Sequence, residues 1–252
     1  MIAGKKVIIV LPAYNAANTL GATYDEIPKE FIDEALLVDD ASEDNTYEIS
    51  RNLGIRTLRH DRNRGYGANQ KTCYKTALQM GGDIIVMLHP DYQYSPRLIP
   101  AIVTLLAYGP YDVVLGSRIL AGGALKGGMP LYKFVFNRVL TAVQNLAWHS
   151  KISEFHTGLR GFKRHVLEAI NFEANSDDFV FDNQIIAQIM WHGHRIGEVS
   201  CPTLYFPHAS SIDLKTGLSY GLGVLRTTVE LMAARAGLWT ANYLKRVNCA
   251  LP

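Results

Sequence analysis

Residues 84–96 read IIVMLHPDYQYSP, so that five apolar residues run directly into polar ones. The apolar run predicts a buried β-strand, and Pro90 ends it because proline has no N–H for the ladder. If the chain stays extended past this strand, His89, Asp91 and Gln93 lie on one side of it. An imidazole, a carboxylate and an amide oxygen can hold Mg²⁺ or Mn²⁺ there, because oxygen ligands dominate and no thiolate is near. The alternative is a strand end capped by solvated polar side chains.

The composition favours one large α/β domain, since the chain has 252 residues and 48% of them are hydrophobic. A formal net charge of +2 does not suggest a nucleic-acid partner. Cys73, Cys201 and Cys249 are far apart and lack metal-binding spacing. They therefore argue against a zinc site or a disulfide framework and favour a reducing cytosol. No apolar run reaches the roughly 18 residues that span a bilayer.

Strand and helix patterns alternate through the first half of the chain. We expect strands at residues 6–11, 35–38, 55–58, 84–88 and 112–116, with helices at 18–27, 45–53, 68–80 and 95–106 between them. This alternation predicts a mainly parallel sheet with helices on both faces, whose ligands bind at the carboxyl ends of the strands. Four polar clusters follow such strand ends, at residues 12–15, 39–40, 63–65 and 89–91.

The second half of the chain has a less regular pattern. Apolar periodicity predicts a strand at 196–200 and helices at 131–148, 164–170, 176–191 and 217–244. Residues 154–162 have the composition of a turn-rich polar segment. Arg226, Glu230 and Arg235 interrupt the last helix, so we do not expect it to cross a membrane.

Four motifs, taken together, resemble those of a family 2 glycosyltransferase in their order and spacing. They are VLPAYN at 10–15, VDDASEDNT at 38–46, NRGYGA at 63–68 and LHPD at 88–91. Within that family the chain is most similar to dolichol- and polyprenyl-phosphate mannosyltransferases and related sugar transferases. TGLR at 157–160 and VFD at 180–182 also resemble that branch, less specifically.

The resemblance implies an α/β GT-A fold with a Rossmann-like, mainly parallel central sheet. It also implies a domain organisation, with a glycosyltransferase domain at 1–216 and a C-terminal amphipathic helical extension at 217–252. Within the domain, residues 1–120 would form the nucleotide-binding half and 121–216 the acceptor half. The implied reaction is inverting transfer of a sugar from a nucleotide-diphosphate sugar, GDP-mannose or a UDP-hexose. The preferred acceptor is polyprenyl or dolichyl phosphate, with a glycan as the other acceptor class.

The resemblance also implies which residues contact the nucleotide-sugar. They are Pro12, Ala13, Tyr14, Asn15, Asp39, Asp40, Asn63, Arg64, Gly65, Lys71, His89, Pro90 and Asp91. An aromatic ring can stack on the base, and a carboxylate at a strand end can accept hydrogen bonds from ribose hydroxyls or a base N–H. Gly65 allows the backbone to approach the donor closely. Ordinary turns and a solvated basic loop are the alternatives for these positions.

By the same resemblance, Asp91 binds the Mn²⁺ or Mg²⁺ that bridges the donor diphosphate, with His89 and Gln93 beside it. The family pattern is Asp-x-Asp, and His89 replaces its first acid. Neutral imidazole can still ligate Mn²⁺, but the replacement weakens the case for Mg²⁺.

Catalytic and acceptor contacts are implied for a further set of residues. Arg160 resembles a phosphate-binding arginine, for which a structural salt bridge is the alternative. Asp177, Asp178 and Asp182 are candidates for a general base. We select Asp178, with Asp182 as a supporting acid, because the family's usual Glu is Gln184 here; an anionic phosphate acceptor makes a base less necessary. Arg118, His208 and Ser210 are the remaining predicted acceptor or phosphate contacts.

Two other functions compete with this interpretation. A sugar-phosphate nucleotidyltransferase should carry a glycine-rich loop with a lysine after the first strand, and residues 12–15 lack it. A non-catalytic nucleotide-sugar-binding protein is kept open by His89 and Gln184. The apolar 131–148 segment and the basic C-terminal region predict peripheral contact with the cytoplasmic face of a membrane, or else core packing or a homo-oligomer interface.

Overall fold

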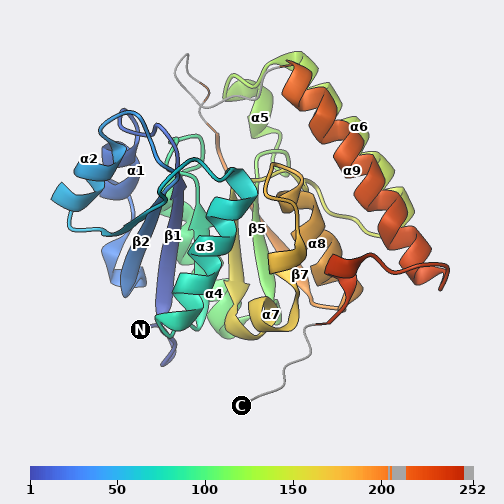
Figure 1. Ribbon diagram of the computed structural model, residues 1–252, viewed down its shortest axis with the longest axis horizontal. Coiled ribbons are helices and arrows are strands. Elements are labelled where there is room, and N and C mark those ends of the chain that lie inside the picture. Colours follow the sequence, from blue (N-terminus) through green and yellow to red (C-terminus); the bar gives the residue numbers. More distant parts are fainter. Residues whose placement is uncertain (204, 206–213, 247–252) are drawn as a thin grey trace.

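The computed structural model describes residues 1–203, 205 and 214–246, so the predicted contacts His208 and Ser210 lie outside the described residues. A seven-stranded sheet in the order β3-β2-β1-β4-β6-β5-β7 forms its centre (Figure 1). The strands are β1 (Val7–Ala13), β2 (Glu34–Asp39), β3 (Arg56–Arg59), β4 (Ile84–Leu88), β5 (Val113–Ser117), β6 (Leu159–Lys163) and β7 (Ile196–Ser200).

All neighbouring strands pair in parallel except those that involve β6, which is antiparallel to β4 and β5. The prediction of a mainly parallel sheet is confirmed, but residues 154–162 are not merely turn-rich, because β6 begins within them. The residue pattern of β6 does not resemble that of a buried strand. Arg160 is a charge at a buried position, and Gly161 leaves room for Ile102 and Leu106, which a Cβ would overlap.

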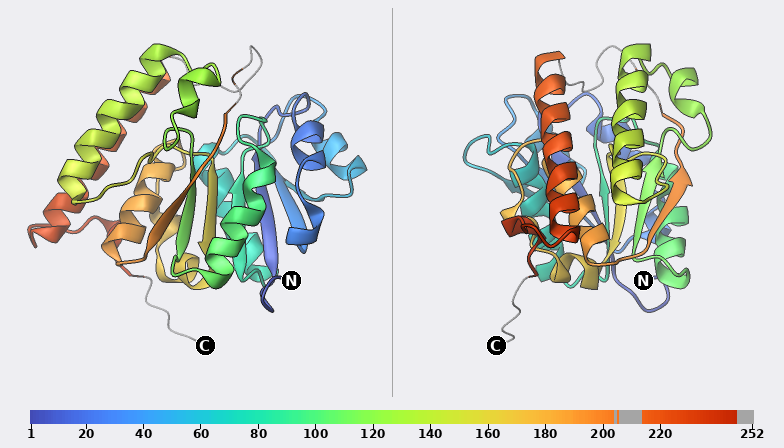
Figure 2. Two further views of the ribbon diagram at one scale, coloured as in Figure 1. Left: turned by 180° about the vertical axis from the view of Figure 1, so that it is seen from behind. Right: turned by 90° about the vertical axis from the view of Figure 1, so that its right-hand side faces the viewer.

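Helices cover both faces of the sheet, as Figure 2 shows from two further directions. One face packs against α3 (Tyr66–Gln79), α7 (Arg164–Ala169) and α8 (Phe181–Trp191). The other packs against α1 (Leu20–Asp25), α2 (Thr46–Asn52) and α4 (Ile99–Tyr108).

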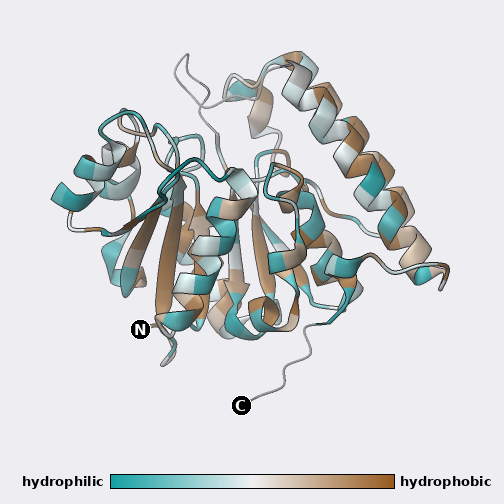
Figure 3. Ribbon diagram, in the orientation of Figure 1, coloured by the Kyte–Doolittle hydropathy of each residue, from teal (hydrophilic) through white to brown (hydrophobic). Residues whose placement is uncertain are grey.

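The burial of β4 on both faces explains why its apolar run is continuous. Ile84, Val86 and Leu88 enter one core, whereas Ile85 and Met87 enter the other, so both faces of the strand are buried. Figure 3 shows the hydrophobic strands enclosed by more polar outer elements.

Two long helices lie side by side beyond the sheet: α6 (Leu131–Trp148), which has its predicted bounds, and α9 (Leu214–Arg235) (Figures 1 and 2). The short α5 (Gly123–Lys126) precedes α6. The prediction of one helix over 217–244 is wrong at its end. The helix ends at Arg235, near Gly237 with a φ of +70°, and a 3-10 turn, η4 (Asn242–Leu244), follows. Within the described residues, no helix is both long and apolar enough to cross a bilayer.

Candidate active site

A cleft of about 900 Å³ opens at the carboxyl edge of β1, β2 and β4 and extends to α6 and α9. Fourteen of the predicted site residues line it: Pro12, Ala13, Tyr14, Asn15, Asp40, Asn63, Gly65, His89, Pro90, Asp91, Gln93, Arg118, Asp178 and Asp182. Segments that are distant in the sequence therefore share one cavity, at the edge that the alternating strand and helix pattern predicts.

Five predicted residues do not line this cleft, namely Asp39, Arg64, Lys71, Arg160 and Asp177. The Asp39 carboxylate is buried and pairs with Arg59 at 3.1 Å. The Lys71 ammonium pairs at 2.6 Å with Asp177. Arg64 has an exposed side chain, while its backbone N–H donates to Asp40. These positions stabilise the loops that border the cleft and do not face its interior.

The end of the cleft that is predicted to bind the nucleotide begins where β1 extends through Pro12 and Ala13, two residues beyond the predicted strand. The Tyr14 side chain is 49% exposed, so its ring is open to stacking. Asn15 has a φ of +51°, and its side-chain oxygen accepts a hydrogen bond from the Glu43 N–H at 2.9 Å. A left-handed asparagine thus fixes the turn that presents Tyr14.

Asp40 organises the neighbouring loop. Its carboxylate accepts hydrogen bonds from His60 Nδ1 at 2.6 Å, from the Arg64 N–H at 2.9 Å and from the Gly65 N–H at 3.0 Å. A carboxylate with three such partners holds residues 60–65 in place against the end of β2.

Gly65, which is predicted to let the backbone approach the donor, lines the cleft, and both Gly65 and Gly67 also pack closely against another segment of the chain. A Cβ on Gly65 would lie 2.6 Å from the Asp177 carbonyl oxygen, and one on Gly67 would overlap Ser176 and Phe181. The Gly67 N–H also donates to the Asp177 carbonyl at 2.7 Å. The two glycines therefore let the acid-rich loop at 176–182 pack onto the segment that follows Asn63.

The segment after β4 is not extended, so the predicted alternation of His89, Asp91 and Gln93 is wrong. Tyr92 has a φ of +59°, and Asp91 Oδ1 accepts a hydrogen bond from the Gln93 N–H at 3.0 Å, which forms a turn. All three side chains nevertheless line the cleft. No described residue donates to the second carboxylate oxygen of Asp91, which leaves that oxygen available to a cation.

Arg160 and Asp182 form a buried ion pair at the base of the cleft, with 3.0 Å between Nη1 and Oδ1. Arg160 is fully buried, so this is the structural salt bridge that was the alternative to phosphate binding. Asp182 also accepts hydrogen bonds from Gln70 at 2.8 Å and from the Tyr66 hydroxyl at 2.7 Å. With three donors, this carboxylate is better suited to support than to proton abstraction.

The other acid of this loop, Asp178, is exposed and lines the cleft. One of its oxygens accepts hydrogen bonds from the Ser176 hydroxyl at 2.8 Å and from the Val180 N–H at 2.9 Å. Gln184 accepts a hydrogen bond from the Ser176 N–H at 2.7 Å, so it holds the loop that carries Asp178.

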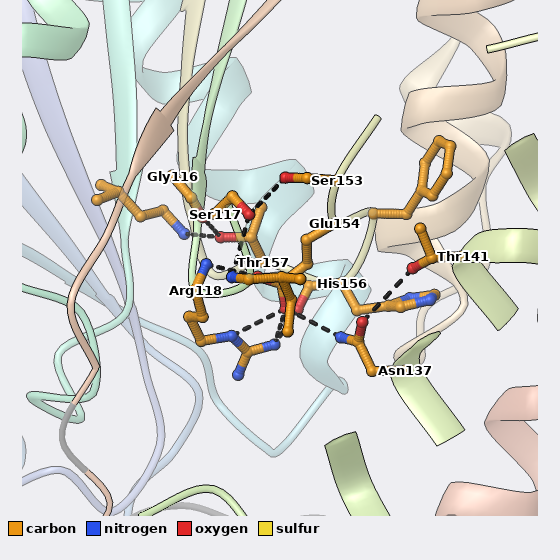
Figure 4. Close-up of polar contacts among 12 residues, drawn as sticks. Gly116, Ser117, Arg118, Asn137, Thr141, Ser153, Glu154, His156 and Thr157 are labelled. Carbon is orange, nitrogen blue, oxygen red and sulfur yellow. Dashed lines mark hydrogen bonds and ion pairs between the residues drawn. The ribbon is translucent and has the colours of Figure 1, made fainter. Parts of the chain in front are cut away.

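The α6 side of the cleft contains a buried cluster around Arg118 and Glu154, shown in Figure 4. Glu154 is fully buried and accepts hydrogen bonds from Arg118 Nε at 2.9 Å and from Asn137 at 3.0 Å. Arg118 Nη1 donates to the Tyr205 hydroxyl at 2.8 Å. These bonds fix the position of the Arg118 guanidinium, and the Glu154 carboxylate balances its charge.

Two further cleft residues carry shifted pKa values. Burial, together with the nearby Arg118 and Arg160, lowers the pKa of His156 to about 3, so its imidazole is neutral. Burial and Arg118 also lower the pKa of Lys133. Lys133 has no ion pair with any residue that the structure describes. Its ammonium is thus not paired with any of the acids that line the same cleft.

Sequence reasoning missed Tyr66, Lys133, Glu154 and His156. Only Glu154 carried a usable signal, because residues 117–153 contain no acid and Glu154 is the first one after them. The others depend on which way a helix or loop turns its side chains, which composition does not reveal.

Comparisons with known proteins agree with this arrangement. The model of glycosyl transferase family 2 matches residues 8–170. An uncharacterized protein of Methanocaldococcus jannaschii is 30% identical, covering 82% of this chain and 84% of that protein. The UDP-N-acetylglucosamine–dolichyl-phosphate N-acetylglucosaminyltransferase of Methanococcus voltae is 26% identical, covering 81% of this chain and 88% of that protein.

Solved structures share the fold at lower identity. Glucosyl-3-phosphoglycerate synthase from Mycobacterium tuberculosis, in complex with Mn²⁺, UDP-glucose and phosphoglyceric acid, has a TM-score of 0.67 at 16% identity. That alignment covers 95% of this chain and 82% of the other.

Proposed function

The chain belongs to glycosyl transferase family 2 and is a glycosyltransferase with a GT-A fold, and from this premise we propose that it transfers a hexose from a UDP-sugar to a polyprenyl phosphate. One observation carries the proposal. A single cleft joins the loops that begin after β1 and β2 to apolar side chains of α6 and α9, and its lining includes Arg118 and also Lys133, which has no ion pair with a described residue. Such a cleft suits a donor that is a nucleotide and an acceptor that is both anionic and lipidic.

The donor would lie against the Tyr14 ring, with its ribose near Asp40. The names of the Methanococcus relative and of the mycobacterial complex both include a uridine nucleotide, which favours UDP over GDP for this chain. Exposed Tyr14 can stack on either base, so the choice between them rests on those relatives.

Asp91 and His89 would hold a divalent cation, with Gln93 beside them. Their chemistry fits, because a carboxylate oxygen and an imidazole nitrogen, both without a described partner, line the same cleft. Mn²⁺ is favoured over Mg²⁺ by the nitrogen ligand and by the Mn²⁺ in the mycobacterial complex. When bound, the cation supplies charge that stabilises the departing diphosphate.

Arg118 and Lys133 would bind the acceptor phosphate. Both line the cleft, and burial together with the positive charge of Arg118 lowers the pKa of Lys133. A phosphate oxygen then attacks C1 of the sugar as the bond to the nucleoside diphosphate breaks, with inversion. Because this nucleophile is already anionic, Asp178 need not remove a proton; it would act as the base only with a hydroxyl acceptor.

The lipid chain would follow the apolar wall out of the cleft. Tyr132, Phe136, Leu140 and Leu218 line the cleft, and Tyr132 and Leu218 are also among the exposed side chains of α6 and α9. The apolar face continues on both helices through Val135, Val139, Val143, Leu146, Leu222, Leu225, Val229 and Met232.

This continuous face would dock onto an anionic bilayer. Residues 117–153 contain five lysines and arginines and no acid, although the whole chain has a net charge of only +2. Of these cations, Lys126 and Lys151 are exposed, whereas Arg118 is buried. The exposed cations and the apolar side chains would complement anionic lipid headgroups. A second copy of the chain would gain from the apolar contact but not from the charge.

The experiment is a thermal-shift panel of UDP, GDP and TDP with and without Mn²⁺, followed by turnover of the stabilising nucleotide's sugars. We expect UDP with Mn²⁺ to give the largest shift, and UDP to be released in step with a lipid-linked product. Pyrophosphate exchange would instead indicate a nucleotidyltransferase, and binding without turnover would indicate a sensor; either would refute the proposal.

A further inference from the structure

A continuous chain of hydrogen bonds leads from the buried arginine to the predicted cation ligand. Arg160 Nη1 donates to Asp182 Oδ1 at 3.0 Å, and the Tyr66 hydroxyl donates to Asp182 Oδ2 at 2.7 Å. The same hydroxyl oxygen lies 2.8 Å from His89 Nε2. Nothing in the proposed transfer step requires Tyr66, so its place between these groups needs its own explanation.

The number of available protons fixes the direction of each bond. Asp182 is a carboxylate that accepts from Arg160, Gln70 and Tyr66 and has no proton to give. The only hydroxyl proton of Tyr66 is donated to Asp182. The bond to His89 must therefore run from Nε2–H to the tyrosine oxygen.

With its proton on Nε2, neutral His89 carries a lone pair on Nδ1. No residue in the described part of the chain bonds to Nδ1, and the ring lines the cleft beside Asp91. The opposite ring edge is packed: a Cβ on Gly158 would lie 2.9 Å from Cγ and 3.0 Å from Cδ2 of His89. The ring is thus held at one edge by Gly158 and at Nε2 by Tyr66.

We propose that Tyr66 is a positioning residue that fixes the tautomer of His89, so that Nδ1 is presented as a nitrogen ligand to the cation beside Asp91. This rests on the cation site of the proposed function. It explains how a chain that lacks the first acid of Asp-x-Asp keeps a defined ligand there. It also makes the site prefer Mn²⁺ or Co²⁺, which accept imidazole, over Mg²⁺, which favours oxygen.

The test is pulsed electron paramagnetic resonance of Mn²⁺ bound to the full chain with UDP, which detects nitrogen coordinated directly to the ion. Wild-type protein should show the nitrogen coupling, and His89→Ala should lose it. Tyr66→Phe should weaken or abolish the coupling and reduce Mn²⁺ affinity about tenfold or more, as removal of an outer partner of a ligating histidine does.

Tyr74→Phe is the matched control, because Tyr74 is a buried tyrosine of the same network whose hydroxyl donates to Gln70 and does not touch His89. It should keep both the coupling and the affinity. His89→Asp should raise Mg²⁺ affinity relative to Mn²⁺, whether or not Tyr66→Phe folds. No nitrogen coupling in wild type, or unchanged coupling and affinity in folded Tyr66→Phe, would overturn the proposal.

These results are separable from the fate of the proposed reaction. Nitrogen coupling that Tyr66→Phe weakens, without any sugar transfer, would support the role of Tyr66 and refute the function. Sugar transfer with Mn²⁺ but without nitrogen coupling would do the reverse.

Discussion

Replacing Glu154 by glutamine should destabilise the fold by about 3–5 kcal/mol, although the two side chains have nearly the same shape. Glu154 is completely buried and accepts hydrogen bonds from the Arg118 backbone N–H at 2.7 Å, from Arg118 Nε and from Asn137. Arg118 is itself 9% exposed, so its charge would remain buried without a counterion. The amide would also turn an N–H₂ group toward a site that now contains only donors.

Urea unfolding followed by circular dichroism measures this cost. Glu43→Gln is the control, because Glu43 is exposed, and its effect should stay within about 0.5 kcal/mol. The Arg118→Gln, Glu154→Gln double variant should lose less stability than the sum of the single variants, with a coupling of about 1–3 kcal/mol. A loss below about 1 kcal/mol for Glu154→Gln, or additive single losses, would show that the buried pair does not hold Arg118 as we describe.

Three more outcomes follow from the same contacts. Gly67→Ala should cost about 1–3 kcal/mol in urea unfolding, because its Cβ would overlap the Ser176 carbonyl, whereas Gly21→Ala meets no atom within 4 Å and should be neutral or stabilising. Leu222→Glu, at a position 65% exposed on α9, should reduce sedimentation with anionic vesicles while leaving turnover of a short-chain soluble acceptor intact; unchanged sedimentation would exclude this face as the docking surface. Burial lowers the pKa of His156 to about 3 in the folded chain. As the pH falls, the imidazole is therefore protonated in the unfolded chain while it is still neutral in the folded chain. Its stability contribution is present above about pH 6.5 and should fall by about 2 kcal/mol between pH 6.5 and 5, a loss that His156→Gln should remove.

Much of the fold follows from periodicity and length alone. The five apolar residues of β4 had to be buried on both faces, and that required helices on both sides of a parallel sheet. β6 was not predicted, because Arg160 and Gly161 break its apolar pattern. Arg160 forms an ion pair with Asp182, and Gly161 leaves room for α4. Both contacts join segments that are distant in the sequence, so they become visible only in the structure.

The sequence predicted which edge of the sheet holds the candidate site, but it did not predict how the side chains are arranged there. Strand ends placed Asp40 and Asp91 correctly along the cleft. Alternation failed beyond Leu88 because Tyr92 turns the chain, and no local composition rule assigns a left-handed conformation to a tyrosine. The place of Lys133 in the cleft could not be predicted, because it depends on how α6 is rotated about its axis.

Transfer of radiolabelled sugar from a UDP-hexose to polyprenyl phosphate in anionic vesicles tests most directly whether one cleft holds both substrates. Wild-type protein should form a lipid-linked sugar phosphate, and the free polyprenyl alcohol should not accept the sugar. Lys133→Glu should raise the KM for the lipid phosphate at least tenfold while UDP binding is unchanged. Delivery of the sugar only to water, or equal transfer to the alcohol and the phosphate, would contradict the account.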